Sequence, residues 1–264
     1  MSKEKGVLFK INKKDSNTSH YLMGTMHVDN EASYTYIGLA QKFIQKCYFY
    51  YAEMDLTSVN HQEMMEHFKF KDEEKLHHHF KPSHFLKMRK QILKSTGFDL
   101  QVLDDYIPFY IQTMLSEQAL QSRNGLPLDY FLWNYAMTQN KILGGVETME
   151  DQIHILNNIP LDAQIKSLRT TCRNMNKFRK KILWLNNAYQ VGDIRGIYKM
   201  SKKNLGSLRK IMLTERNNRM LESMLQKMKE DSAFFAVGAA HLAGKYGLLR
   251  SLKKEGYKIF PCKE

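Results

Sequence analysis

The sequence has little cysteine, and the pattern of its three cysteines excludes two classes of protein. Cys47, Cys172 and Cys262 are far apart and odd in number. They therefore form neither a disulfide framework nor a metal knuckle built from paired cysteines. A chain without either feature is typical of a reducing compartment, so we expect a cytoplasmic protein.

The sequence also lacks a long hydrophobic run. The longest one in its C-terminal third covers residues 233–240, whereas a helix that spans a bilayer needs about 20 apolar residues. The first six residues include three charged ones and lead into only three apolar residues, so there is no apolar core of a secretory signal. The sequence thus predicts neither a membrane span nor a signal peptide.

Charge of one sign is in excess, because 40 Lys and Arg residues face 27 Asp and Glu residues, a net charge of +13. The basic runs 177–181, 199–203 and 253–254 fall on predicted helices. No nucleic-acid-binding motif accompanies them, so we interpret them as solvated helix faces and expect no specific nucleic acid partner. With 43% apolar residues, the composition excludes a largely disordered chain.

Apolar and aromatic runs predict strands near both ends of the chain and helices between them. The predicted strands are at 6–12, 21–24, 47–54, 141–147, 232–237 and 257–260, and the last two flank a predicted helix at 242–254. This order indicates one core and not two sequential domains. We expect an α/β fold: a mixed β-sheet formed by the N- and C-terminal segments, in a single domain over 1–264. A large helical cap would be inserted at about 60–138 and 160–228.

Four predicted strands run into a small residue and then a side chain that can bind a metal. These side chains are His27, Glu53, Glu147 and His241. The C-terminal ends of strands are where α/β sheets place ligands, because the loops there surround a crevice. Two imidazoles and one or two carboxylates could hold a divalent cation there and leave positions open for water. Alternatively, each histidine is a core residue that hydrogen-bonds a loop carbonyl.

Several longer motifs follow one another along the chain. They are 21–28 (YLMGTMHV), 51–56 (YAEMDL), 145–153 (GVETMEDQI), 213–220 (LTERNNRM), 237–249 (VGAAHLAGKYGLL), 256–257 (GY) and Pro261. In these motifs and their order the chain resembles the TraB/PrgY/GumN family, which includes the Tiki metalloproteases of animals. The resemblance implies a fold related to erythromycin-esterase and ChaN-like proteins, with an α/β core and a helical cap.

The resemblance also implies a metal-dependent peptidase that uses manganese, cobalt or zinc. By position, the histidines of its two Gly-x-x-His motifs are His27 and His241, and the first-choice glutamate is Glu53. These three residues would ligate the metal. Glu147 and Arg216 fall in further family motifs and would line the catalytic site.

Each of these residues also has a structural alternative. A carboxylate, Glu53 or Glu147, would accept a proton from metal-bound water, but Glu147 also directly precedes a predicted helix, whose N-terminus favours an acidic residue. Arg216 would clamp a substrate carboxylate or an oxyanion, or else form a salt bridge that holds its helix to the core. Asn217 and Gln152 are weaker candidates that could simply satisfy buried backbone groups.

We therefore expect a hydrolase that cleaves small peptides, with a peptide or small molecule as its substrate. Two alternatives remain open: a protein that binds a peptide or pheromone without cleaving it, and a metal-independent, esterase-like hydrolase with a histidine base. The histidines at 77–79 and His84 are not expected to bind metal, because adjacent residues on a helix cannot all face one ion.

Overall fold

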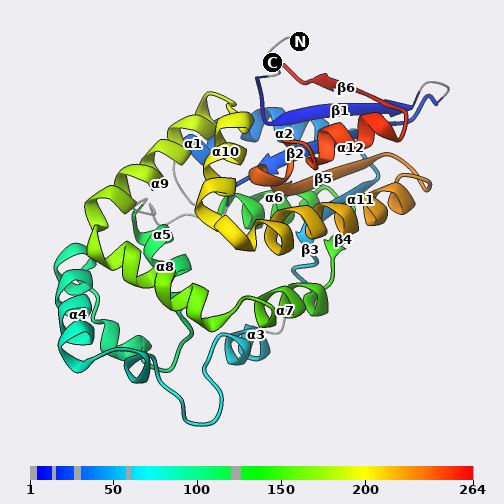
Figure 1. Cartoon of the computed structure of the whole chain (residues 1–264). Helices are drawn as coiled ribbons and strands as arrows, with labels where there is room; N and C mark the ends of the chain where they lie inside the picture. Colours follow the sequence, from blue (N-terminus) through cyan, green and yellow to red (C-terminus); the bar gives the residue numbers. More distant parts are fainter. Residues whose placement is uncertain (1–4, 14–15, 27–30, 58–60, 120–125, 264) are drawn as a thin grey trace. The chain divides into compact units, whose positions relative to one another are not determined.

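The computed structural model describes residues 5–13, 16–26, 31–57, 61–119 and 126–263 (Figure 1). The chain forms two compact units. The sheet unit comprises Met1–Ser58, Arg123–Ile155 and Leu185–Glu264, and the helical unit comprises Val59–Ser122 and Leu156–Trp184. The expectation that helices cap the catalytic site stays a prediction.

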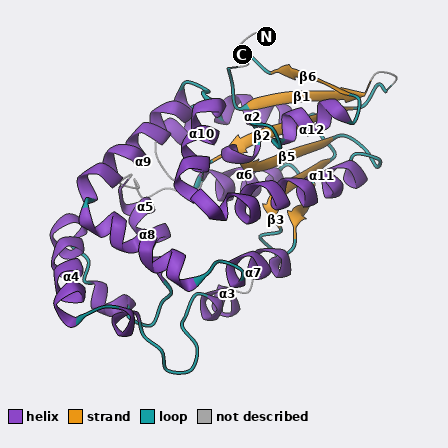
Figure 2. Ribbon diagram, in the orientation of Figure 1, coloured by secondary structure: helices purple, strands orange, loops and turns teal. Residues whose placement is uncertain are grey.

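Six strands in the described ranges form one mixed sheet with the order β4-β3-β5-β2-β1-β6 (Figure 2). Their bounds are Leu8–Lys13 (β1), Ser19–Thr25 (β2), Phe49–Met54 (β3), Ile142–Glu147 (β4), Ala233–Gly238 (β5) and Tyr257–Pro261 (β6). The strands β2, β5, β3 and β4 are parallel, whereas β1 is antiparallel to both β2 and β6. The predicted α/β class, with a mixed sheet built from both ends of the chain, is confirmed.

Aromatic residues hold the neighbouring strands β3 and β5 in register. Tyr50 pairs with Phe234 and Tyr51 with Phe235, and the two pairs of rings are stacked with centroids 5.8 and 5.4 Å apart. Since successive side chains of a strand point to opposite faces, one stack lies on each face of the sheet. Both faces therefore need a covering layer, which explains why β5 is apolar along its whole length.

Helices of the sheet unit supply these layers. Trp133 of α6 (Leu128–Thr138) packs edge-on against Tyr50, with ring centroids 6.0 Å apart. On the opposite face, the ammonium group of Lys227 in α11 (Arg216–Lys227) lies 4.6 Å from the centroid of the Tyr51 ring. The result is a three-layer sandwich of helix, sheet and helix.

The remaining helices of this unit connect the strands. They are α1 (Glu31–Tyr34), α2 (Ile37–Ile44), α7 (Met149–Asn157), α10 (Ile194–Leu205) and α12 (Leu248–Lys254), while α7 and α9 (Met175–Gln190) extend across the boundary between the units. Directly before α11, residues Lys210–Glu215 form a π-helical segment. None of the helices in the described ranges combines the length and the apolar character needed to cross a bilayer.

The helical unit has an apolar core of its own. It contains α3 (His61–His67), α4 (Pro82–Thr96), α5 (Pro108–Ala119), α8 (Leu161–Arg173) and two short 3₁₀ turns, η1 (Leu76–His79) and η2 (Leu100–Leu103). Ile92, Ile111 and Leu168 are fully buried at the centre of this core. Pro82 begins α4, where a missing N–H has no consequence, and Gly97 ends it in the left-handed conformation (φ 73°).

One predicted helix is shorter than expected. The sequence predicts a helix from residue 242 onward, but the segment after β5 forms a 3₁₀ turn, η5 (Ala239–His241), and α12 begins only at Leu248. The turn at Gly244 has a φ of 101°, which interrupts a helix. The Asn217 side chain donates to the carbonyl of Tyr246 (2.7 Å) and so satisfies a backbone group of this loop.

Candidate functional site

Three parallel strands of the sheet unit end at the same edge, and each delivers a group to one site. Glu53 lies one residue before the end of β3, Glu147 is the last residue of β4, and Gly238 is the last residue of β5. Since the C-terminal ends of parallel strands meet at one edge of a sheet, these residues lie close together although they are distant in sequence.

Arg216, the first residue of α11, joins the two glutamates. Its Nε donates to Oε1 and Oε2 of Glu147 (3.0 and 3.2 Å), and its Nη2 donates to Oε2 of Glu147 at 2.5 Å. The same Nη2 also donates to Oε1 of Glu53. The three side chains therefore form a buried ion-pair triad in which the arginine is held by two charged partners.

Burial controls the protonation of this triad. The side chain of Glu147 is 0% exposed, and those of Arg216 and Glu53 are 11% and 13% exposed. Burial raises the pKa of Glu147, and the hydrogen bonds and charge of Arg216 offset only part of this effect. Burial by itself would lower the pKa of Arg216, but the two glutamates outweigh it and the net shift is upward.

The charges in the triad do not balance. Two ionised carboxylates and one guanidinium leave a formal charge of −1 in a poorly solvated place. The charge of nearby Arg219 lowers the pKa of Glu147 and offsets part of this excess. The remainder favours a proton on the buried Glu147 or a cation beside the partly exposed Glu53.

Glu53 is also fixed by the main chain at the end of β5. Its Oε2 accepts a hydrogen bond of 2.9 Å from the backbone N–H of Gly238. A Cβ atom on Gly238 would lie 3.3 Å from Oε2 of Glu53 and 3.4 Å from Cδ2 of the His241 ring. The carboxylate of Glu53 and the imidazole of His241 thus flank the same point, and glycine leaves that point open.

Asn217 fixes the orientation of His241, which is buried. The side-chain amide of Asn217 donates to the carbonyls of His241 (3.3 Å) and Tyr246 (2.7 Å). Its Oδ1 lies 2.6 Å from Nδ1 of His241. Because Oδ1 can only accept, Nδ1 carries the hydrogen, and acid–base or ligand chemistry at His241 must use Nε2.

The structure brings four of the five predicted site residues to this edge of the sheet: Glu53, Glu147, Arg216 and His241. The fifth, His27, lies outside the described residues. Strand β2, which leads towards it, ends at Thr25, and this residue pairs with Gly238 of β5. Thr25 is buried, and its hydroxyl finds no hydrogen-bond partner within the described ranges.

The donor set suits a divalent metal. Within the part of the chain that the structure describes, no three His, Cys, Asp or Glu side chains form a group that could hold one. An imidazole nitrogen and a carboxylate oxygen are nevertheless the donors that manganese, cobalt and zinc accept. Each carboxylate oxygen has two lone pairs, so the hydrogen bonds to Glu53 do not exhaust its capacity. The ligand set of His27, Glu53 and His241 stays a prediction.

Two residues contribute more to the geometry of the site than the sequence indicated. Asn217 is a weak candidate in the sequence, yet it orients His241 directly. Gly238 belongs to the second Gly-x-x-His motif but was not predicted as a site residue, because its contributions are a backbone N–H and a missing side chain. One signal in the sequence could have identified Asn217. It directly follows Arg216, and both residues lie at the start of one helix.

Comparison with known proteins reveals distant relatives. The chain is 28% identical over 186 residues to the metalloprotease TIKI2 of Danio rerio and 26% identical over 186 residues to the metalloprotease TIKI1 of Homo sapiens. Both alignments cover 58% of this chain but only 36% and 37% of the relatives, so the chain spans little more than a third of their length. No solved structure matches the chain. The sequence profile of the TraB/PrgY/gumN family matches residues 7–261, and the chain belongs to this family.

Proposed function

We propose that this chain is a metal-dependent peptidase that holds a divalent cation through His27, Glu53 and His241. The observation that supports this most is the approach of Glu53 and His241 to one point beside Gly238. The similarity to proteins named metalloproteases supports the same chemistry. A bound divalent cation would polarise the scissile carbonyl and lower the pKa of its water towards neutrality.

In this proposal, Arg216 binds the substrate. Its Nε and Nη2 are held by the two glutamates, whereas its Nη1 makes no hydrogen bond within the described residues. This N–H group can donate to a peptide carboxylate or to the negative charge that develops on the carbonyl oxygen. Glu147 orients Arg216, because its fully buried side chain cannot reach a substrate.

Glu53 and His241 act next to the substrate. Of the two glutamates, Glu53 is more exposed than Glu147. Its carboxylate is therefore the better placed to take a proton from the attacking water. His241 contributes Nε2 as a ligand, while Asn217 holds the ring through Nδ1. Such a partner behind a ligating histidine fixes the tautomer and raises its basicity.

Peptide cleavage with and without metal tests the proposal. The purified protein is treated with chelator and supplied with Mn²⁺, Co²⁺ or Zn²⁺, and a mixture of short synthetic peptides is followed by mass spectrometry. We expect cleavage only with metal, and loss of cleavage in His241→Ala but not in His84→Ala, a control histidine that is exposed in the helical unit. Cleavage that survives both chelation and His241→Ala would overturn the mechanism.

A second candidate is a protein that binds a peptide without cleaving it. One observation favours it: both oxygens of Glu53 already accept hydrogen bonds, from Arg216 and Gly238, and these compete with a metal. In that case the peptides would bind to the protein and would be recovered intact in the presence of each of the three metal ions. Hydrolysis of an ester by the metal-free protein would instead support the esterase-like alternative.

A further inference from the structure

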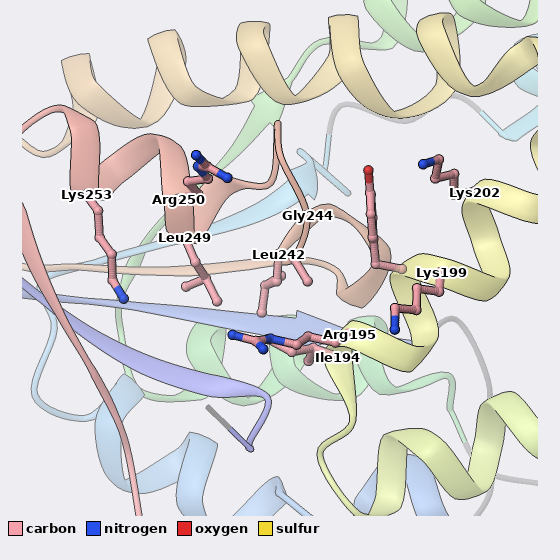
Figure 3. A pocket seen from close by; sticks show the side chains of 11 residues that line it. Ile194, Arg195, Lys199, Lys202, Leu242, Gly244, Leu249, Arg250 and Lys253 are labelled. Carbon is pink, nitrogen blue, oxygen red and sulfur yellow. The ribbon is translucent and has the colours of Figure 1, made fainter. Parts of the chain in front are cut away.

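A basic pocket lies between α10 and the segment from η5 to α12 in the sheet unit (Figure 3). It has a volume of about 830 Å³. The helix α10 contributes Arg195, Lys199 and Lys202, and α12 contributes Arg250 and Lys253. The five cations thus come from two segments that are about 50 residues apart in the sequence, and the fold brings them to one place.

The spacing of these residues makes the pocket a concentrated positive site. Residues 195, 199 and 202 are four and three positions apart, so they share one face of α10, and residues 250 and 253 likewise share one face of α12. Within the described ranges, no carboxylate forms an ion pair with Arg195, Lys199, Lys202 or Arg250. Like charges at these spacings repel one another, and an anion between the helices would remove that repulsion.

The bottom of the pocket is apolar. Leu242 and Leu249 line it and are 0% and 5% exposed. Tyr198 borders the pocket as well, and its ring lies so close to Gly244 that a Cβ there would be 2.3 Å from the ring. Glycine at 244, with a φ of 101°, is therefore required for the ring to pack in this place.

We propose that this pocket binds a small organic phosphate, a phosphate monoester attached to an apolar group. The volume lies in the range of small-molecule pockets, roughly 300–1,000 Å³. A phosphate monoester carries close to two negative charges at neutral pH, and lysine and arginine bind its oxygens with strong charge-assisted hydrogen bonds. The apolar group packs on Leu249 and on the ring of Tyr198. The proposal does not depend on the metal site, since neither Glu53 nor His241 lines the pocket.

Calorimetric titration with phenyl phosphate tests the proposal, in chelator so that no metal can bind the phosphate. Inorganic phosphate, benzoate and phenol are the comparison probes. We expect phenyl phosphate to bind at least about tenfold more tightly than each of them, because only phenyl phosphate has both the dianion and the ring. Similar affinity for inorganic phosphate or for benzoate would overturn the assignment.

A pair of matched variants locates the binding. Lys199→Gln with Lys202→Gln removes two charges three positions apart on α10, and we expect a loss of affinity of at least about tenfold. Lys87→Gln with Lys90→Gln removes two exposed charges at the same spacing on α4 and should leave affinity unchanged. Equal weakening by both lysine pairs would reduce the effect to net charge and overturn the proposal.

The source of the phosphate is tested with vesicles that contain phosphatidic acid. Because the net charge is +13, we expect some co-sedimentation with these anionic vesicles, and we expect Lys199→Gln with Lys202→Gln to reduce it no more than Lys87→Gln with Lys90→Gln does. Binding to the vesicles that requires Lys199 and Lys202, without binding to phenyl phosphate, would place the ligand in a membrane surface and contradict a soluble ligand.

Discussion

Arg216 and Glu147 form an ion pair in which the glutamate side chain is 0% exposed and accepts hydrogen bonds from two nitrogens of the guanidinium group. Removing the arginine leaves this carboxylate buried without a partner. We expect Arg216→Met to lower the free energy of unfolding by about 3–5 kcal/mol at pH 7. Glu147→Gln should lower it less, by about 1–2 kcal/mol, because the amide oxygen still accepts from Arg216. Urea denaturation measures both.

The two variants should also differ in their pH dependence. Burial raises the pKa of Glu147, so its contribution to stability is present below its ordinary pKa and is lost as the pH rises through the raised value. Without Arg216 the pKa rises further, and the loss in Arg216→Met should therefore shrink on acidification. If both variants lost the same free energy of unfolding at every pH, the result would contradict the claim that Arg216→Met leaves Glu147 buried without a charged partner.

Asn217 should control metal affinity through His241. Asn217→Ala removes the acceptor that lies 2.6 Å from Nδ1, so the ring loses its fixed tautomer and orientation. We expect the affinity for Mn²⁺ or Co²⁺ to fall by about 10–100-fold, measured by competition with a metal-sensitive dye. The exposed neighbour Asn218, changed to Ala on the same helix, is the control. Unchanged affinity in Asn217→Ala would mean that His241 is not a ligand.

The sequence predicted those features of the fold that depend on local pattern, namely the individual strands and helices. Apolar runs predicted the strands β1 and β2, and the aromatic run at 47–54 predicted β3. The helix predicted from residue 242 was too long, because apolar spacing does not register a glycine that turns the chain at 244. Strand order was not predictable either, since neighbouring strands such as β2 and β5 are far apart in the sequence and no local pattern links them.

The parts of the candidate site that are formed by side chains were predictable from the sequence. Glu53, Glu147 and His241 were candidates because acidic and imidazole groups after strands are visible in a sequence, and Arg216 was a candidate because it falls in a motif of the family that the chain resembles. The bond from the Gly238 N–H was not visible, since every residue but proline has that group. The basic pocket was missed for another reason: spacing shows that residues 195, 199 and 202 share a helix face, but not which helix that face meets.

Gly238 should be essential for the site and of little importance for the fold. In Gly238→Ala the new Cβ would crowd Glu53 and His241 at 3.3 and 3.4 Å, so one of them must move by a few tenths of an ångström. We expect peptide cleavage to fall roughly tenfold or more with little change in melting temperature. Gly38→Ala, at an exposed position of α2 with no atom within 4 Å, is the control and should add about 0.5–1 kcal/mol of stability. Full activity in Gly238→Ala would show that the space beside Gly238 is not used.

His20 should make the protein sensitive to mild acid. Burial lowers the pKa of this histidine in β2 from its ordinary 6.5 to about 4, and the nearby charge of Asp231 offsets only part of the shift. The neutral ring is therefore favoured in the folded state, and its contribution to stability is complete above pH 6.5 and lost as the pH falls towards 4. The whole effect is about 3 kcal/mol at most. His20→Leu should flatten the dependence of unfolding free energy on pH over this range, whereas His84→Leu, at an exposed position, should leave it as in the wild type. A wild-type slope retained in His20→Leu would assign the acid sensitivity to other groups.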